Sequence, residues 1–262
     1  MNNKEDRKLN DELLALFLFM LAYVNRTEFK NLLHIYKQHR DNLKNEVNKI
    51  YAKYSSNNKI LITTSDLNKE VKVFEKDLKT IGQDLRKQEN KLLSLILSLV
   101  YKDTYFKSTD ILSKYLDNVS NINKLKNKVV KDSINKKIDD KIIYDRNKIN
   151  KEKLITKVKN DIKSNLKKGL AIDVINKQID KDFGTWGYVS QRLLENEISR
   201  EFNNSLMKSY KDNGVERVQY NSALEKNTCS VCESLDGVIF DIDNAPHLPL
   251  HTNCKCWYEP VL

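Results

Sequence analysis

The four cysteines of this 262-residue chain form two tight pairs near its C-terminus. Cys229 and Cys232 make a C-x-x-C knuckle, and Cys254 and Cys256 follow with one residue between them. Thiolate and imidazole are the usual ligands of tetrahedral zinc, and a knuckle that faces a second pair of ligands is a common way to hold the ion. The spacing therefore predicts one structural zinc site, with five candidate ligands: Cys229, Cys232, His251, Cys254 and Cys256.

Five candidates compete for four positions around the ion. In an extended segment Cys254 and Cys256 point to the same side, so both could reach one zinc. Alternatively, His251 joins one of them and the spare thiol packs against the protein. We expect His247, beside Pro246, to lie on the surface. The alternative to a closed structural site is an empty one, with reduced or partly disulfide-linked cysteines.

An apolar run at residues 13–24 bears on the compartment, because disulfides would need an oxidising one. Basic residues precede the run, as in a signal peptide, but acidic Asp11 and Glu12 adjoin it and no small-residue cleavage site follows. The run is also too short to span a bilayer. We interpret it as part of a buried amphipathic helix, which favours reduced, metal-bound cysteines in a bacterial cytosol.

Helix-breaking residues concentrate in the last third of the chain. All three prolines lie at or after Pro246, and five of the six glycines lie at or after Gly169. This distribution predicts a mainly α protein with a small C-terminal α+β module. We expect a long-helix region at residues 1–180, forming a hairpin or bundle, and a compact cysteine-cluster domain at residues 181–262.

Two helical segments are expected in the N-terminal region. Residues 10–54 carry apolar side chains at three- and four-residue steps, which predicts one helix. A loop is expected at residues 55–58, and N-cap oxygens at residues 64–66. Residues 67–92 form a heptad seam, interrupted by Gln88. The seam could join two subunits as a coiled coil, but we favour an antiparallel hairpin that packs on residues 10–54.

Residues 120–168 hold 16 Lys or Arg and six Asp or Glu, a difference of +10 that equals the net charge of the whole chain. Apolar stripes at residues 130–142 and 155–166 predict one or two helices with lysine-rich outer faces. Lys136, Lys137, Lys148 and Lys151 are expected to point outward. Such a face could contact DNA phosphates without sequence specificity, or could simply be solvated.

The C-terminal third alternates helix, turn and strand signals. We expect a turn at residues 183–187, a helix at residues 189–212 that stops at Gly214, and a strand within residues 215–223. The Leu235-Asp236-Gly237 sequence predicts a tight turn that leads into another strand.

The order of these features resembles the phage Mu F-like minor head protein family, also called the phage head morphogenesis domain. The resemblance covers roughly residues 185–260. The motifs that carry it are Asn196-Glu197-Ile198 on a helix, Thr228-Cys-Ser-Val-Cys232, Leu235-Asp236-Gly237 and Pro249-Leu-His251-Thr-Asn-Cys254-Lys-Cys256. The chain departs from the family where Asn196 replaces a threonine, Tyr220 a tryptophan and Thr252 a proline, but all five candidate ligands are present.

The resemblance implies a minor capsid protein of the virion that acts in head morphogenesis beside the portal or neck. Portal protein and major capsid protein are the implied partners, and DNA packaging, delivery or ejection is an implied setting. Some homologous domains are fused to toxins, which makes a toxin-like enzyme a further alternative. Catalysis is disfavoured because there is no P-loop, and Glu195, Glu197 and Glu201 share a helix without a catalytic partner in the sequence. No catalytic residue is therefore predicted.

Overall fold

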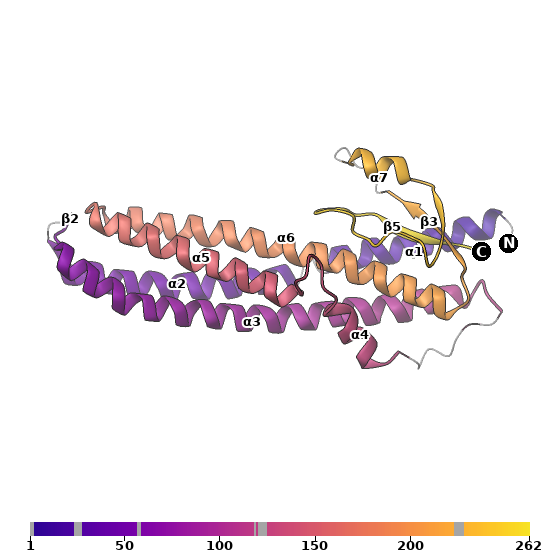
Figure 1. The fold of residues 1–262 in the computed structure, drawn as a ribbon, viewed down its shortest axis with the longest axis horizontal. Helices are drawn as coiled ribbons and strands as arrows, with labels where there is room; N and C mark the ends of the chain where they lie inside the picture. Colours follow the sequence, from indigo (N-terminus) through magenta and orange to yellow (C-terminus); the bar gives the residue numbers. More distant parts are fainter. Residues whose placement is uncertain (1–2, 24–27, 57–58, 118, 120–124, 223–227) are drawn as a thin grey trace. The chain divides into compact units, whose positions relative to one another are not determined.

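The computed structural model describes residues 3–23, 28–56, 59–117, 119, 125–222 and 228–262 (Figure 1). The chain divides into two compact units. Unit 1 comprises Met1–Glu28, Leu93–Ile142 and Arg192–Leu262, and unit 2 comprises Phe29–Leu92 and Ile143–Gln191. Each unit therefore combines segments that are far apart in the sequence. The predicted division into a long-helix region (residues 1–180) and a cysteine-cluster domain (residues 181–262) stays a proposal.

The predicted fold class is confirmed: 72% of the described residues are helical, with a small strand region at the C-terminus. The helices of the described residues are α1 (Asn3–Tyr23), α2 (Phe29–Tyr54), α3 (Thr64–Leu112), α4 (Asn127–Ile134), α5 (Ile143–Lys167), α6 (Ile172–Asp212) and α7 (Ser230–Leu235). Among these helices, none has both the length and the hydropathy of a membrane-spanning segment.

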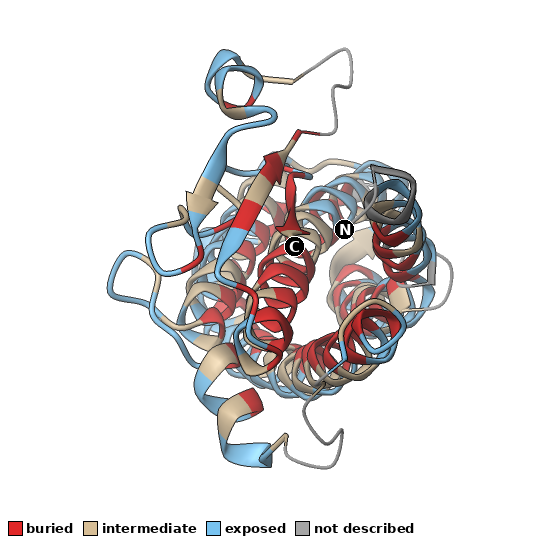
Figure 2. Ribbon diagram, turned by 90° about the vertical axis from the view of Figure 1, so that its right-hand side faces the viewer, coloured by how far each residue is buried: buried red, intermediate tan, exposed pale blue. Residues whose placement is uncertain are grey.

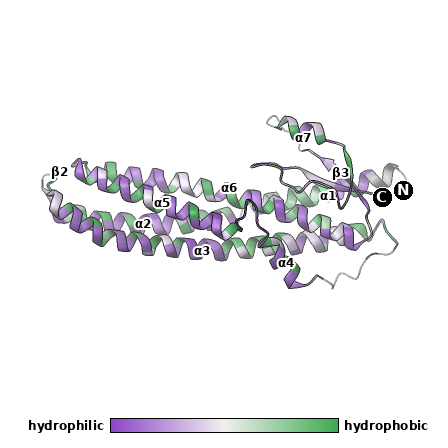
Figure 3. Ribbon diagram, in the orientation of Figure 1, coloured by the Kyte–Doolittle hydropathy of each residue, from purple (hydrophilic) through white to green (hydrophobic). Residues whose placement is uncertain are grey.

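Unit 2 is a bundle built from α2, α5 and the first parts of α3 and α6. Lys53 pairs with Glu70 (2.6 Å), and His39 pairs with Asp84 (3.1 Å), so α2 and α3 run antiparallel. The short strands β1 (Ser55–Ser56) and β2 (Lys59–Ile60) pair at their junction, where a loop was expected. The helices of the bundle alternate hydrophobic and hydrophilic positions along their length (Figure 3), as amphipathic helices with one buried face do.

The heptad seam of α3 lies in the interior of this bundle. Leu67, Val71, Phe74, Leu78 and Leu85 are all buried within the single chain. This burial favours the interpretation as an internal helical hairpin over a coiled coil between subunits. The cap of α3 lies one residue before the predicted positions, because the Thr63 hydroxyl oxygen accepts the Asp66 N–H (3.1 Å).

A buried polar network crosses the centre of the bundle. Lys151 Nζ lies 2.6 Å from Glu89 Oε2 and donates to Ser190 Oγ (2.8 Å), and Tyr36 Oη lies 2.7 Å from the same Ser190 oxygen. The side chains of Lys151 and Glu89 are 3% and 0% exposed. The prediction that Lys151 points outward is therefore wrong, because this ammonium has its counter-ion inside the bundle. Desolvation lowers the pKa of Lys151, and Glu89 opposes that shift.

Two further expectations about helices were wrong. Residues 10–54 form two helices, α1 and α2, while residues 24–27 between them lie outside the described part of the chain. The turn expected at residues 183–187 is helical and continues α6. A Cβ at Gly187 would lie 3.7–3.8 Å from side-chain atoms of Tyr36 and Leu33, which is ordinary van der Waals contact, so this position lies where α6 packs on α2. Packing thus overrides the helix-breaking tendency of glycine, which is about 1 kcal/mol.

Unit 1 combines α1, α4, the later parts of α3 and α6, and the C-terminal sheet. The apolar run of α1 is buried on one face, as predicted, at Leu9, Leu13, Phe17 and Met20. Phe17 packs on Phe202 of α6, with ring centroids 4.8 Å apart. The same ring stacks on Trp257 of the C-terminal strand at 5.4 Å.

The predicted apolar stripe over residues 130–142 is only partly helical. Helix α4 ends at Ile134, with Val130 and Ile134 buried. Ile138 and Lys141 then pair across Asp139 and Asp140, both of which have positive φ. Asp tolerates this left-handed conformation, so two adjacent aspartates can form a tight hairpin turn without glycine. The second stripe is helical, as expected, and Val158, Ile162 and Leu166 of α5 are buried.

The C-terminal sheet has the order β4-β3-β5 and is antiparallel. Helix α6 ends at Asp212, as predicted, and Gly214 follows with φ +77°. The Val215 N–H returns to the Tyr210 carbonyl (3.0 Å) to close a Schellman stop. Strand β3 (Arg217–Asn221) then pairs with β4 (Ile239–Asp241) on one side and with β5 (Trp257–Val261) on the other. The two strands predicted after Gly214 and after Gly237 correspond to β3 and β4. Residues 223–227, including the expected end of the first strand, lie outside the described residues.

Candidate metal centre

The first cysteine pair is positioned by the short helix α7. Cys229 precedes the helix and Cys232 lies within it. The Cys229 sulfur accepts the backbone N–H of Cys232 (3.4 Å), so both thiols of the knuckle turn to the same side. After α7 the chain turns at Gly237, which has positive φ, and enters β4. The predicted Leu235-Asp236-Gly237 turn is thus present at the expected place.

The second group of ligands lies on the segment that leads into β5. Asn253 has φ +64°, and Cys254 N–H donates to the His251 carbonyl (3.2 Å), so the chain reverses between His251 and Cys254. This reversal brings the imidazole and the Cys254 thiol to one place. Cys254 and Cys256 are both buried, whereas His251 is exposed at the rim.

The sulfur and nitrogen atoms of this cluster are close together. His251 Nε2 lies 3.1 Å from Cys229 Sγ and 3.2 Å from Cys232 Sγ, and Cys232 Sγ lies 3.8 Å from Cys254 Sγ. A tetrahedral zinc has S–S edges of about 3.8 Å and S–N edges of about 3.5 Å, given its bond lengths. The sulfur pair matches that edge, and the nitrogen separations are shorter by a few tenths of an ångström. All four cysteines are free thiols, and with His251 they could hold a metal ion.

His251 is oriented with one ring nitrogen toward the sulfurs. Its Nδ1 lies 2.9 Å from the Thr252 carbonyl oxygen, which can only accept, so Nδ1 carries the proton. In the neutral ring Nε2 then has a free lone pair, and that atom faces Cys229 and Cys232. A carbonyl that fixes the tautomer in this way is a usual partner of a metal-ligating histidine.

The two thiols of the last cysteine pair influence each other's pKa. The side-chain hydrogen bond from Cys256 lowers the pKa of Cys254 to about 5, and the same contact raises the pKa of Cys256. Cys254 therefore has the character of a ligand, and Cys256 that of a donor to it. The structure also gathers Cys232, Cys254 and Cys256 within ligand distance of one another. Cys232 belongs to both possible ligand groups.

Helix α6 holds the segment that carries these ligands. Asn196 Oδ1 accepts the Asn253 N–H (2.7 Å), Ser199 Oγ donates to the Cys254 carbonyl (3.3 Å), and Asn203 Nδ2 donates to the Cys256 carbonyl (3.1 Å). Residues 196, 199 and 203 share one face of the helix. The sequence prediction missed this supporting role, although three uncharged polar residues at helical spacing were a visible signal.

Tyr220 of β3 lies beneath the cluster. Its side chain is buried. Desolvation raises the pKa of Tyr220 most, and the side chains of Cys232 and Cys256 raise it further. The Tyr220 ring packs edge-on against Tyr258, with centroids 5.7 Å apart. An aromatic floor of this kind excludes water from the inner side of the site.

The glutamates of α6 do not form a catalytic pair. Arg200 Nη2 lies 2.6 Å from Glu197 and 2.7 Å from Glu201, and all three side chains are buried. Ser133 of α4 donates to Glu201 Oε2 (2.6 Å), so the cluster attaches α4 to α6. The sequence placed these glutamates on an ordinary charged face, and the structure makes two of them internal ion-pair partners.

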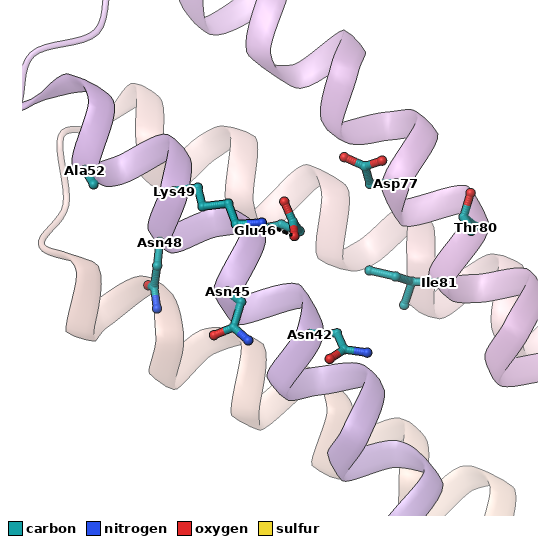
Figure 4. A pocket seen from close by; sticks show the side chains of 9 residues that line it. All are labelled: Asn42, Asn45, Glu46, Asn48, Lys49, Ala52, Asp77, Thr80 and Ile81. Atoms are coloured by element: carbon teal, nitrogen blue, oxygen red, sulfur yellow. Dashed lines mark hydrogen bonds and ion pairs between the residues drawn. The ribbon is translucent and has the colours of Figure 1, made fainter.

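A surface histidine and an open groove lie apart from the cysteine cluster. His247 accepts a hydrogen bond from Lys136 Nζ (3.2 Å) and lies on the surface, as predicted. An open groove of about 820 Å³ between α2 and α3 is lined by Asn42, Asn45, Asn48 and Thr80 among others (Figure 4). Its Glu46 pairs with Lys49 (2.8 Å). The nine lining residues offer amides, two carboxylates, an ammonium and a hydroxyl, and the Thr80 hydroxyl donates to the Lys76 carbonyl (3.1 Å) and not to a base.

A small sheet on a buried helix, closed by clustered thiols and an imidazole, is the kind of module that a structural metal stabilises. The family model described as Phage Mu protein F like protein matches residues 156–259. The predicted resemblance of the C-terminal region is therefore confirmed, and the match begins further upstream than expected, within α5. No curated protein and no solved structure gives a significant match to the chain.

Proposed function

We propose that this protein is a minor head protein of a tailed phage and acts in head morphogenesis. The observation that carries the proposal is the match of residues 156–259 to the Phage Mu protein F like family. The ordered ligand segment on α6 adds support, because the residues that carry the resemblance form one contiguous site. The proposed role is structural rather than enzymatic.

Within this role we assign a structural zinc to the C-terminal module. Cys229, Cys232, His251 and Cys254 would hold it, and Cys256 would donate its thiol proton toward Cys254. Four thiolate and imidazole ligands suit zinc better than calcium or magnesium, which prefer oxygen ligands. The ion would join α7 to the segment before β5, two parts of the module that are distant in sequence.

The proposed place of action is the portal vertex of the virion, after assembly in the host bacterial cytoplasm. Residues 1–155 lie outside the family match, so a docking surface specific to this phage is expected among the N-terminal helices. The portal protein and the major capsid protein are the proposed partners, and several copies would be present in each particle.

The test is mass spectrometry of intact virions and of virions after DNA ejection. A minor head protein should be present in intact particles at a copy number well below that of the major capsid protein. If it also leaves with the genome, it should be depleted from the ejected shells. Absence from purified virions, together with normal heads from a phage that lacks the gene, would contradict the proposal.

A second candidate function is contact with DNA in the head, and α4 with the turn after it favours this role. Lys126, Lys128, Lys131, Lys137 and Lys141 are exposed there and form no ion pair within the described residues. Each phosphate that such lysines neutralise releases counter-ions, so binding should weaken steeply with salt. Lys151 cannot contribute, because it is buried in unit 2.

Replacing Lys128, Lys131, Lys137 and Lys141 by Gln tests this second role. DNA binding should weaken uniformly across sequences, with a flatter salt dependence. The matched control replaces the same number of exposed lysines on α3, at positions 72, 76, 79 and 87. Equal loss in both variants would assign the effect to net charge, and undetectable binding by the wild type at low salt would remove this candidate.

A further inference from the structure

Strand β4 is an open edge of the C-terminal sheet. The sheet order is β4-β3-β5, so β4 pairs on one side only. Tyr220 N–H donates to the Val238 carbonyl and Ile242 N–H donates to the Glu216 carbonyl, both at 2.8 Å. Because backbone groups alternate in direction along an antiparallel strand, the N–H groups of Ile239 and Asp241 point away from β3. In the described part of the chain, no strand pairs with that side.

The side chains around this edge are apolar and exposed. Ile239 is 48% exposed and Val238 is 37% exposed, while Val231 on the neighbouring helix α7 is 56% exposed. Strand β5 differs, because its first four residues are buried (Figure 2). An exposed aliphatic edge is a template for pairing with another strand, and proteins usually protect such edges.

The edge is also acidic in a basic protein. Residues 228–254 contain no Lys or Arg but four acidic residues, whereas the whole chain has a net charge of +10. Asp243 pairs with Lys211, and Asp236 accepts the Ser222 N–H. Glu233 and Asp241 are exposed and form no ion pair within the described residues, and with Arg217 of β3 opposite Asp241 the edge keeps an excess of negative charge.

We propose that the β4 edge, comprising residues 238–241 with Val231 and Glu233 of α7, binds an extended basic segment of a partner protein by strand addition. The partner's backbone would pair with Ile239 and Asp241. Because these two side chains lie on the same face of the strand, they would meet an apolar and a basic residue that are two positions apart in the partner. Nucleic acid does not fit this surface, because its phosphates would be repelled.

A second copy of this chain is a poorer occupant than another protein. Its lysine-rich segments that the structure describes are α4, the hairpin turn after it and α5, so they do not offer an extended strand. The proposal goes beyond the role in head assembly and is tested on purified protein. It can therefore fail while the virion experiment succeeds, and the reverse also holds.

The probe is a fluorescent peptide of Val-Thr-Lys-Thr repeats, which places Val and Lys in turn on one face of a strand, measured by anisotropy with the full-length protein. Two further peptides carry N-methyl groups on alternate amides, one on the Val and Lys amides and the other on the Thr amides. Strand addition uses only one set of amides, so one methylated peptide should bind like the parent and the other at least tenfold more weakly. Equal binding by both methylated peptides would overturn strand addition without any change to the protein.

The matched protein variants are Ile239→Pro and Ile239→Val. Proline removes the outward N–H and is tolerated at an edge position whose N–H faces solvent, so the β3–β4 pairing should remain. We expect at least tenfold weaker peptide binding for Ile239→Pro, little change for Ile239→Val, and an unchanged metal content for both. Replacing Glu233 by Gln and Asp241 by Asn should weaken binding about threefold or more and flatten its salt dependence.

Three results would overturn the proposal. The first is no binding of the parent peptide at low salt. The second is equal binding by Ile239→Pro and wild type, which would leave only a non-specific charge effect. The third is concentration-dependent dimerisation of the wild type that Ile239→Pro abolishes, because the edge would then pair with a second copy of the chain.

Discussion

The bundle of unit 2 and the sheet of unit 1 contrast in how many contacts hold them. The bundle packs four helical segments around a continuous apolar seam. The sheet has strands of only five, three and five residues, and its β4 is largely exposed. Sheets this small rarely have enough apolar contact to be stable alone, and usually depend on packing against a helix, a disulfide or a metal.

The contrast teaches where a single change should do most harm. Stability in the bundle is distributed over many buried aliphatic side chains, with one internal ionic network. In the C-terminal module, α7 and the segment before β5 meet at the thiol and imidazole atoms of the candidate metal centre. A substitution there should remove the link that the candidate metal centre would supply between α7 and the segment before β5.

The largest effect is expected from Cys232→Ser, because Cys232 belongs to both possible ligand groups. The variant should lose the metal and the protease resistance of residues 215–262, while the helices of unit 2 remain. Structural zinc sites contribute about 10–16 kcal/mol of binding free energy that is also folding free energy. Limited proteolysis with mass spectrometry measures the outcome, and Ser230→Ala on α7 is the control. If residues 215–262 of Cys232→Ser stayed resistant to protease, the C-terminal module would not depend on the candidate metal centre.

A smaller effect is expected from Lys151→Met in the bundle. The change leaves the Glu89 carboxylate buried without its counter-ion, which costs about 3–5 kcal/mol. Replacing both residues by Met should restore most of the stability, because no buried charge is then left unpaired. Urea unfolding followed by circular dichroism measures both variants. Equal losses in the single and double variants would show that the pair itself stabilises the bundle, and metal content should not change in either.

The smallest effect concerns the pH dependence of unit 1. Burial raises the pKa of Glu201 to about 7 from an ordinary 4.5, so the folded state binds this proton more tightly than the unfolded state. The stability it contributes is full below about pH 4.5 and is lost as the pH rises through about 7. The slope should be at most about 1.4 kcal/mol per pH unit. Thermal melting should be measured for the wild type and for Glu201→Gln between pH 5 and 8. The unfolding free energy of the wild type should fall more steeply with pH than that of the variant, by up to this slope. The same pH dependence in both proteins would refute the assignment to Glu201.

The spacing of apolar residues was sufficient to predict a helix and its buried face where that face is purely apolar. The seam at residues 67–92 and the second stripe of the basic segment were both predicted from spacing. Spacing failed where the chain leaves the helix without glycine or proline, as at Asp139 and Asp140. It also failed at Gly187, where the contact with α2 depends on residues more than a hundred positions away.

Buried charges were the other failure. Lys151 and Arg200 were each surrounded by polar neighbours in the sequence, and residue type alone placed the lysine outside. Their counter-ions, Glu89 for Lys151 and Glu197 with Glu201 for Arg200, become visible only when helices are assembled. The candidate metal ligands were predictable because thiols are rare in this chain and closely spaced. The choice among them was not, because it depends on the turn at Asn253 and on the tautomer of His251.

The most direct test of the central claim is the metal content of the protein purified without chelator. Elemental analysis should give close to one zinc per chain, and Cys256→Ser should retain it while Cys254→Ser should lose it. Less than about a tenth of a zinc per chain, in protein with intact helix content, would contradict a structural metal in the C-terminal module.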